Sequence, residues 1–176
     1  PLPGEHQLTN ALTALGALTA LNHLGFSVSR EAMQMGMAQV RWPARLEWAG
    51  QVLLDGGHNP QGIAALKKYV QTFLAARRRV LVTGVLEEHL QADMLQDLGA
   101  LAAEIVTITP DSPRALSGER LASMLQAAGF RASAAASVHE ALDRAQRLAG
   151  PEGVVLAAGS LYLAGAVRTE LGLPWK

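Results

Sequence analysis

Leu54-Asp55-Gly56-Gly57-His58-Asn59-Pro60 indicates the end of a buried strand, a tight glycine turn and the start of a helix. Asn59 is a favourable N-cap, and Pro60 suits the first helical position because its missing N–H would have no partner there. The turn therefore places a carboxylate, an imidazole and several backbone N–H groups at the carboxyl end of a strand. In open α/β sheets, ligands bind at that edge.

Composition excludes several classes of protein. Of the 176 residues, 49% are hydrophobic and 17% are charged, so a sizeable core can form. Lys and Arg together number 15, as do Asp and Glu, so the chain lacks the net positive charge that is typical of nucleic-acid-binding proteins. The absence of cysteine excludes disulfides and thiolate metal sites. Since no apolar run reaches membrane-spanning length, we expect a cytoplasmic protein with neither nucleic-acid nor membrane partners.

The first 54 residues predict two helices and a hairpin. Residues 5–24 favour a helix that is apolar nearly all round, as expected of a helix buried against a missing partner domain. Ser29 caps a second helix over 30–38. Two strands, 45–48 and 51–54, follow, and we expect them to form a hairpin. The opening Pro1-Leu2-Pro3-Gly4, without an initiator Met, leads us to expect a piece of a longer protein.

After Pro60, helices and strands alternate. The capping box Ser137-Val138-His139-Glu140 opens one of the helices. The expected helices span 60–75, 92–103, 118–128, 138–148 and 161–171, and the expected strands span 80–83, 105–108, 131–135 and 154–158. The strands are continuous apolar runs separated by helices of about ten residues or more. We therefore expect an α/β fold with a mainly parallel sheet of about six strands and helices on both faces.

In such a sheet, four strand-to-helix turns meet at one edge. The turns bring Asp55, His58, Asn59, Arg114 and Ser160 towards one crevice, where two helix N-termini favour an anion. Each residue also has a purely structural interpretation, such as Asp55 stabilising its own turn or Ser160 acting only as an N-cap. Taken alone, these residues leave the two interpretations evenly balanced.

No complete set of catalytic motifs is evident in the sequence. It lacks a phosphate-binding Gly-x-x-x-x-Gly-Lys loop, a dinucleotide glycine fingerprint and a Gly-x-Ser-x-Gly nucleophile elbow. Glu87, Glu88 and His89 are consecutive and cannot all face one point, so we expect no metal site there. We assign no catalytic residue within this chain.

Five motifs, in order, resemble those of folylpolyglutamate synthases and dihydrofolate synthases, members of the Mur ligase superfamily. The turn at Asp55 resembles the family's Leu-Asp-Gly-Ala-His-Asn-Pro signature. The other four are Gly4-Glu5-His6-Gln7 with Asn10-Ala11, Trp42-Pro43-Ala44-Arg45-Leu46-Glu47, Ser112-Pro113-Arg114-Ala115, and Gly159-Ser160-Leu161-Tyr162-Leu163-Ala164-Gly165. The resemblance spans essentially the whole chain.

The resemblance implies a Rossmann-like C-terminal glutamate-ligase domain over 41–176, preceded at 1–40 by the last helices of a central ATP-binding domain. The family uses ATP to phosphorylate a carboxylate on dihydropteroate or a folate glutamate tail, and the amine of L-glutamate then attacks the acyl phosphate. Its Mg²⁺ ligands belong to the part of the family's chain that precedes this one. We therefore expect the chain alone to be inactive, to pack on its own N-terminal ATPase domain, and to be a monomer.

The resemblance also implies roles for individual residues. Asn10, Arg45 and Asp55 fall on positions that contact ATP, whereas His58 and Ser160 fall where the family holds the incoming glutamate. An Asn amide can bind an adenine edge, Arg can bind phosphate oxygens, and Asp can accept from ribose hydroxyls. Asn59 and Arg114 would lie at the edge of this site.

Two departures from the family pattern bear on these roles. The family usually shows Gly-x-Leu-x-Asp-Lys-Asp after its second parallel strand, and this chain has Gly84-Val85-Leu86-Glu87-Glu88-His89-Leu90 there. The glycine and leucine are kept but the Lys and the second Asp are lost, a change that could alter substrate preference. Ala44 replaces the glycine of Pro-Gly-Arg, a mild change if this residue has negative φ.

Two other functions stay open. One is a Mur-type peptidoglycan ligase domain, although Gly56-Gly57 lacks the tyrosine that those enzymes usually carry in this turn. The other is a non-catalytic module that binds an anion or nucleotide. The sequence does not distinguish a dihydrofolate synthase from a folylpolyglutamate synthase or a bifunctional enzyme.

Overall fold

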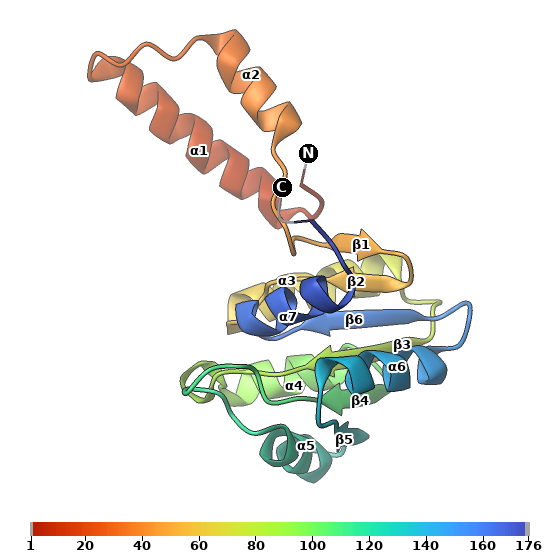
Figure 1. Cartoon of the computed structure of the whole chain (residues 1–176). Helices are drawn as coiled ribbons and strands as arrows, with labels where there is room; N and C mark the ends of the chain where they lie inside the picture. Colours follow the sequence, from red (N-terminus) through yellow and green to blue (C-terminus); the bar gives the residue numbers. More distant parts are fainter. Residues whose placement is uncertain (1, 175–176) are drawn as a thin grey trace.

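A six-stranded sheet forms the centre of the computed structural model, which describes residues 2–174 (Figure 1). The strand order is β1-β2-β6-β3-β4-β5. The strands are β1 (Glu47–Ala49), β2 (Val52–Leu54), β3 (Arg79–Thr83), β4 (Glu104–Thr107), β5 (Ala132–Ala134) and β6 (Val154–Ala158). β1 pairs antiparallel with β2, and the other four pairings between these strands are parallel. The mainly parallel sheet and the hairpin are therefore confirmed.

Helices cover both faces of the sheet. They are α1 (His6–His23), α2 (Arg30–Gln39), α3 (Pro60–Phe73), α4 (Ala92–Ala100), α5 (Gly118–Ala127), α6 (Val138–Ala149) and α7 (Leu161–Glu170), with a short 3-10 helix η1 (Glu87–His89) after β3. One core joins α3, α4 and α5 to one face, and the other joins α6 and α7 to the opposite face. Successive strand residues alternate between the two cores, as Val52, Leu53 and Leu54 do.

The predicted bounds hold within three residues, and the differences have local causes. The helix expected to reach residue 103 ends at Ala100, because the backbone tightens to a bond from Leu101 N to Leu98 O. In the capping box, Ser137 Oγ accepts from Glu140 N as expected. The Glu140 carboxylate, however, accepts from Ala136 N, one residue before the position that the motif predicts.

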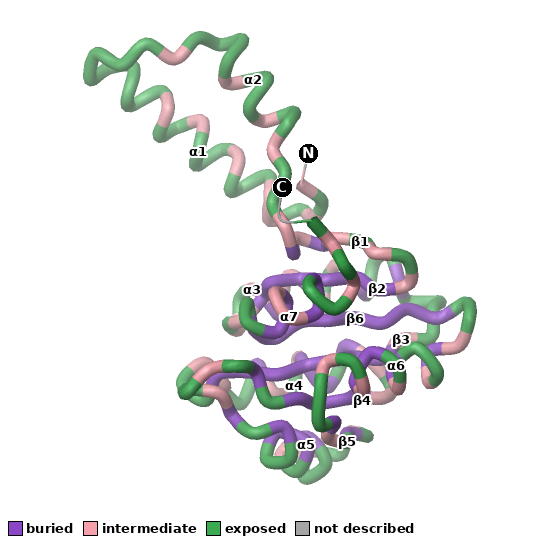
Figure 2. Tube along the Cα trace, viewed as in Figure 1, coloured by how far each residue is buried: buried purple, intermediate pink, exposed green. Residues whose placement is uncertain are grey.

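The hairpin of α1 and α2 projects away from the sheet (Figure 1). Neither helix contains a buried residue (Figure 2), and Leu8 and Leu12 are 69% and 70% exposed. No other described part of the chain buries the first helix, so its packing against another domain stays a prediction. Among the described residues, no helix has the length and apolar character needed to cross a membrane.

A buried ion pair ties α7 to the hairpin of β1 and β2. Arg168, only 2% exposed, donates to both carboxylate oxygens of Glu47 and to Pro174 O. The other role of Glu47 is to accept from Ala44 N at 2.8 Å. The pair therefore fixes the loop that leads into β1.

Glu47→Gln should lower the free energy of unfolding by about 3 kcal/mol, because it removes the negative charge that Glu47 supplies to a buried guanidinium. Urea unfolding followed by circular dichroism at pH 7 measures this loss. Asp143→Asn is the matched control, since Asp143 pairs with Arg147 on the exposed surface of α6 and should cost less than about 1 kcal/mol. Equal losses in the two variants would contradict the structural role of Glu47.

The effect of Glu47→Gln should also depend on pH. Burial raises the pKa of Glu47, but the hydrogen bonds from Arg168 and Ala44 and the charge of Arg168 bring it below its ordinary 4.5. A carboxyl group with a lowered pKa contributes stability that is present above 4.5 and lost as the pH falls below it. The difference between wild type and Glu47→Gln should therefore shrink in unfolding curves recorded below pH 4.5.

Candidate functional site

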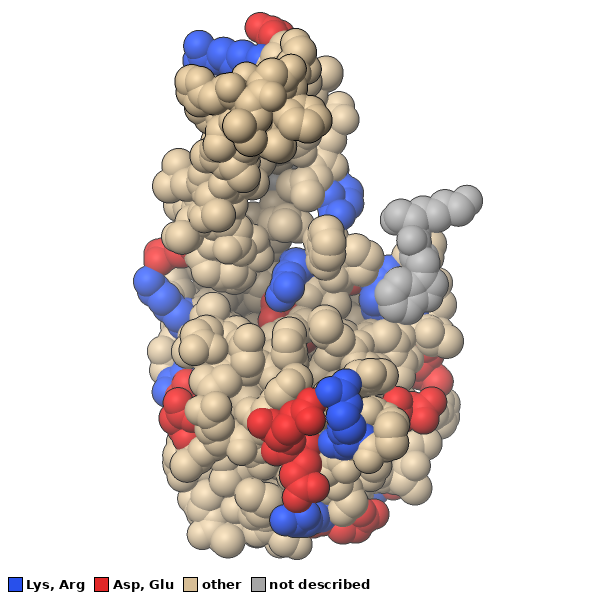
Figure 3. All heavy atoms as spheres, turned by 90° about the vertical axis from the view of Figure 1, so that its left-hand side faces the viewer, with Lys and Arg blue, Asp and Glu red and all other residues tan. Residues whose placement is uncertain are grey.

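The candidate site lies at the carboxyl edge of the sheet, on the left in Figure 1 and facing the viewer in Figure 3. The turn after β2 begins with Asp55, which is 5% exposed. Asp55 Oδ1 accepts from Gly57 N at 2.8 Å, and Oδ2 accepts from Leu46 N at 3.1 Å. One carboxylate thus holds both its own turn and the loop that carries Arg45.

That loop has an unusual backbone. Ala44 has a φ of +53° and Leu46 a φ of +49°. The condition under which alanine would be a mild replacement for glycine at position 44 is therefore not met, and its left-handed conformation costs about 1–2 kcal/mol. Ala44 O accepts from Gly56 N at 2.7 Å, so this loop and the Asp55 turn hold each other in place.

The turns after β2 and β6 are also joined. Gly159 N donates to Gly57 O at 2.9 Å, and Gly159 has a φ of +118° that favours glycine. Ser160 is 1% exposed, and its hydroxyl caps α7 by accepting from Tyr162 N. The Asn59 side chain caps α3 by accepting from Gly62 N at 2.8 Å. Two helix N-termini therefore meet at this edge, as predicted.

Beside them, the two imidazoles of His58 and His89 lie 5.6 Å apart, centroid to centroid. His58 Nδ1 is 3.0 Å from Gly56 O, which leaves Nε2 for a ligand. Thr83, at the end of β3, is fully buried, and its hydroxyl has no hydrogen-bond partner among the described residues. Such orphaned groups are uncommon among buried side chains.

Arg114 reaches the same edge from the loop after β4. Arg114 Nη1 lies 2.5 Å from Glu88 Oε1. The pKa of Arg114 is raised, first by its hydrogen bond to the Tyr162 side chain and then by the charge of Glu88. Sequence reasoning missed Glu88 and Tyr162 as members of this cluster, although each follows a strand whose end was expected here.

The three residues assigned to ATP lie at the junction between the helical hairpin and the sheet. Arg45 lines a cavity of about 600 Å³, together with Trp42 and Arg168. Asn10 lines an adjoining cavity of about 530 Å³ and donates to Gln7 Oε1 at 3.0 Å. Arg45 is near enough to Asp55 for its charge to act on that carboxylate, whereas Asn10 lines the neighbouring cavity.

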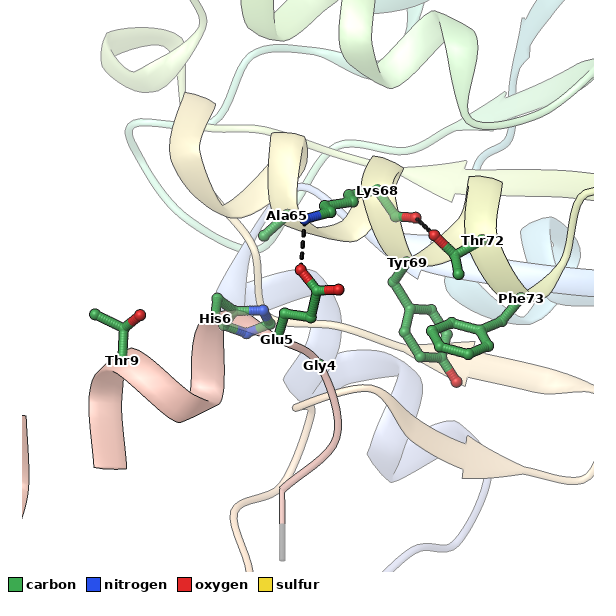
Figure 4. Close-up of a pocket in the computed structure, with 9 residues that line it drawn as sticks. All are labelled: Gly4, Glu5, His6, Thr9, Ala65, Lys68, Tyr69, Thr72 and Phe73. Carbon is green, nitrogen blue, oxygen red and sulfur yellow. Dashed lines mark hydrogen bonds and ion pairs between the residues drawn. The ribbon is translucent and has the colours of Figure 1, made fainter. Parts of the chain in front are cut away.

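A third cavity, of about 330 Å³, separates the start of α1 from the outer face of α3 (Figure 4). Glu5 spans it to Lys68, with Oε2 and Nζ 2.5 Å apart. Tyr69 and Phe73 close its other side, their ring centroids 4.9 Å apart. The ion pair between Glu5 and Lys68 connects the start of α1 to the sheet domain.

Asp55→Asn should lower the free energy of unfolding by about 1–3 kcal/mol, because an amide can accept only one of the two backbone bonds well. Burial raises the pKa of Asp55 above 3.8, against the bonds from Gly57 and Leu46 and the charges of Arg45 and His6. A raised pKa means that the stability this group contributes is fully present below 3.8 and is lost as pH rises.

The difference between wild type and Asp55→Asn should therefore widen in urea unfolding curves as the pH falls from 7 towards 3.8. This trend is opposite to the one expected for Glu47→Gln, which serves as the internal comparison. A difference that shrinks with falling pH would contradict the burial of Asp55 as the dominant influence on its pKa.

The chain is similar to known proteins over nearly all of its length. The sequence pattern of the family described as Mur ligase, glutamate ligase domain, matches residues 44–161. Dihydrofolate synthase/folylpolyglutamate synthase of Mycobacterium tuberculosis is 34% identical over 98% of this chain and 39% of the relative.

Two solved structures extend the comparison. Folylpolyglutamate synthase of Mycobacterium tuberculosis, complexed with ADP, has a TM-score of 0.87 at 31% identity over 99% of this chain and 42% of that one. A bifunctional folylpolyglutamate synthase/dihydrofolate synthase with Mn, AMPPNP and L-glutamate bound has a TM-score of 0.75 at 26% identity, over 89% and 38%. The chain spans about two fifths of the length of these relatives. By the match over residues 44–161, it belongs to the Mur ligase family and contains that family's glutamate ligase domain.

Proposed function

We propose that this chain is the glutamate-binding part of a longer ATP-dependent ligase that joins L-glutamate to dihydropteroate, to folate glutamate tails, or to both. The order of groups along the carboxyl edge carries this proposal. Arg45 and Asp55 lie at the β1–β2 end, and His58 and Ser160 follow after β2 and β6. A nucleotide and an amino acid bound in that order would lie side by side.

At the nucleotide end, each residue suits one part of ATP. The guanidinium of Arg45 can pair with phosphate oxygens, and the amide of Asn10 can bind an adenine edge. Each Asp55 oxygen accepts one backbone bond and keeps a second lone pair for a ribose hydroxyl. The ADP and AMPPNP complexes of similar proteins support this assignment.

At the amino-acid end, the helix N-termini of α3 and α7 carry partial positive charge and can hold a carboxylate. With Nδ1 donating to Gly56 O, the neutral imidazole of His58 offers Nε2 as an acceptor, which suits the amine of the same ligand. The Ser160 hydroxyl is used as a cap, so its contribution is to direct the N-terminus of α7. The L-glutamate bound in a similar structure supports this part of the proposal.

In the proposed reaction, ATP phosphorylates a substrate carboxylate and the amine of L-glutamate displaces the phosphate to form the amide. This chain would orient the amine and, by closing on the ATPase domain, exclude water from the acyl phosphate. Mg²⁺ would accompany ATP, held by residues outside this chain, and a solved relative with Mn supports a divalent metal.

The same proposal assigns residues 1–40 to the central ATP-binding domain and 41–176 to the glutamate-ligase domain. The unburied apolar side chains of α1 support it, as does the family match that begins at residue 44. We propose a cytoplasmic monomer in which α1 and α2 pack on the protein's own ATPase domain.

Phosphate release by the full-length protein tests the function. With ATP, Mg²⁺ and L-glutamate, we expect glutamate-dependent release when either dihydropteroate or a reduced folate is added, and the productive substrate identifies the amide that is made. The isolated chain should be inactive. Arg45→Gln should raise the KM for ATP by about tenfold or more, because a charge-assisted contact to phosphate is lost.

Release with neither substrate would contradict the folate ligase. Activity with a peptidoglycan precursor instead would favour a Mur-type peptidoglycan ligase. Saturable binding of glutamate or nucleotide by the isolated chain, without turnover by the full-length protein, would favour a binding module.

A further inference from the structure

The turn that departs from the family pattern is fixed against the loop after β4. Leu86 and Ala115 form an antiparallel bridge. Glu87 N donates to Arg114 O at 3.0 Å, and Leu116 N donates to Val85 O at 3.0 Å. The backbone therefore sets which side chains of the two segments meet.

The side chains that meet there are those of Arg114 and Glu88, which form an ion pair accessible to solvent. Arg114 and Glu88 side chains are 54% and 46% exposed, with Nη1 and Oε1 2.5 Å apart. Glu88 Oε1 also lies 3.6 Å from His89 Nε2, and His89 in turn packs on His58. Figure 3 shows acidic and basic groups side by side on this face. An exposed pair of this kind is weak enough for another carboxylate to replace one partner.

The strand order gives the bound amino acid a direction. Arg45 and Asp55 lie at the β1–β2 end, His58 and Ser160 follow β2 and β6, and Arg114 follows β4 on the far side of β3. If the amine points towards the nucleotide, the side chain of the amino acid extends towards β4. A side-chain carboxylate would then arrive beside the guanidinium of Arg114.

We propose that Arg114 binds the side-chain carboxylate of the incoming amino acid, and that Glu88 occupies the same guanidinium while the site is empty. This inference rests on the proposed function and deepens it. Glu88 is then a specificity-determining residue, because its carboxylate competes with that of the substrate. His89, between Glu88 and His58, lies where it can donate to whichever carboxylate is bound.

The adjacent residue supplies a matched control. Glu87 pairs with Arg120 of α5 at 2.6 Å, and the two side chains are 60% and 63% exposed. The residue type, the turn, the exposure and the kind of partner are alike in the two pairs. Of the two side chains, that of Glu88 contacts the His89 and Arg114 side chains and that of Glu87 does not, so only the loss of the Glu88 carboxylate should affect binding of the amino acid.

Steady-state kinetics of the full-length protein, with L-glutamate and L-glutamine as alternative amino acids, test the inference. Glu88→Gln should lower the KM for glutamate about two- to fivefold, the range expected for an exposed ion pair, with little change in kcat. Glu87→Gln should leave both constants unchanged. Arg114→Gln should raise the KM for glutamate at least about tenfold and reduce the preference for glutamate over glutamine.

An unchanged or raised KM for glutamate in Glu88→Gln, with normal turnover, would overturn the competition while leaving the ligase assignment intact. Equal losses with glutamate and glutamine in Arg114→Gln would overturn contact with the side-chain carboxylate. Absence of glutamate-dependent turnover in the wild-type protein would instead overturn the proposed function itself.

Discussion

The carboxylate of Asp55 is the constraint on which the rest of the site depends. Its two oxygens accept from Gly57 N in its own turn and from Leu46 N in the loop ahead of β1. The first bond shapes the turn that presents His58 and starts α3, and the second sets the position of Arg45. A single buried side chain therefore sets the spacing between Arg45 and His58, which we propose serve the nucleotide and the amino acid respectively.

The loop that carries Arg45 is strained, and its neighbours compensate for the strain. Ala44 and Leu46 are both left-handed, a conformation that costs free energy for any residue except glycine. The Glu47 carboxylate accepts from Ala44 N, and Gly56 N donates to Ala44 O. Arg168 in turn donates to the carboxylate of Glu47. Strain of this kind persists only where the surrounding structure over-determines the backbone, and such places are often functional.

Sequence reasoning predicted the features that depend on local chemistry, namely the parallel sheet and the starts of the helices. Apolar runs separated by helices gave the parallel sheet, and side-chain caps such as Asn59 gave the helix starts. It could not pair Glu47 with Arg168, 121 residues apart, because that contact requires β6 to lie next to β2. The contact between Glu88 and Arg114 likewise depends on strand order. The assignments of Asn10 and His58 came from the resemblance, because their residue types alone also fit structural roles.

The ion pairs Arg168–Glu47 and Arg114–Glu88 differ in burial, and this difference separates a role in stability from a role in specificity. Arg168 is buried, so its pair with Glu47 cannot be exchanged without leaving a charge in the core. Arg114 and Glu88 are half exposed, so replacing either leaves no buried charge behind. Their turn could therefore depart from the family pattern at Glu87-Glu88-His89 without weakening the core. Under the proposed function, changes in amino-acid preference are thus expected at the β3–β4 rim, while the proposed nucleotide site at the β1–β2 end is retained.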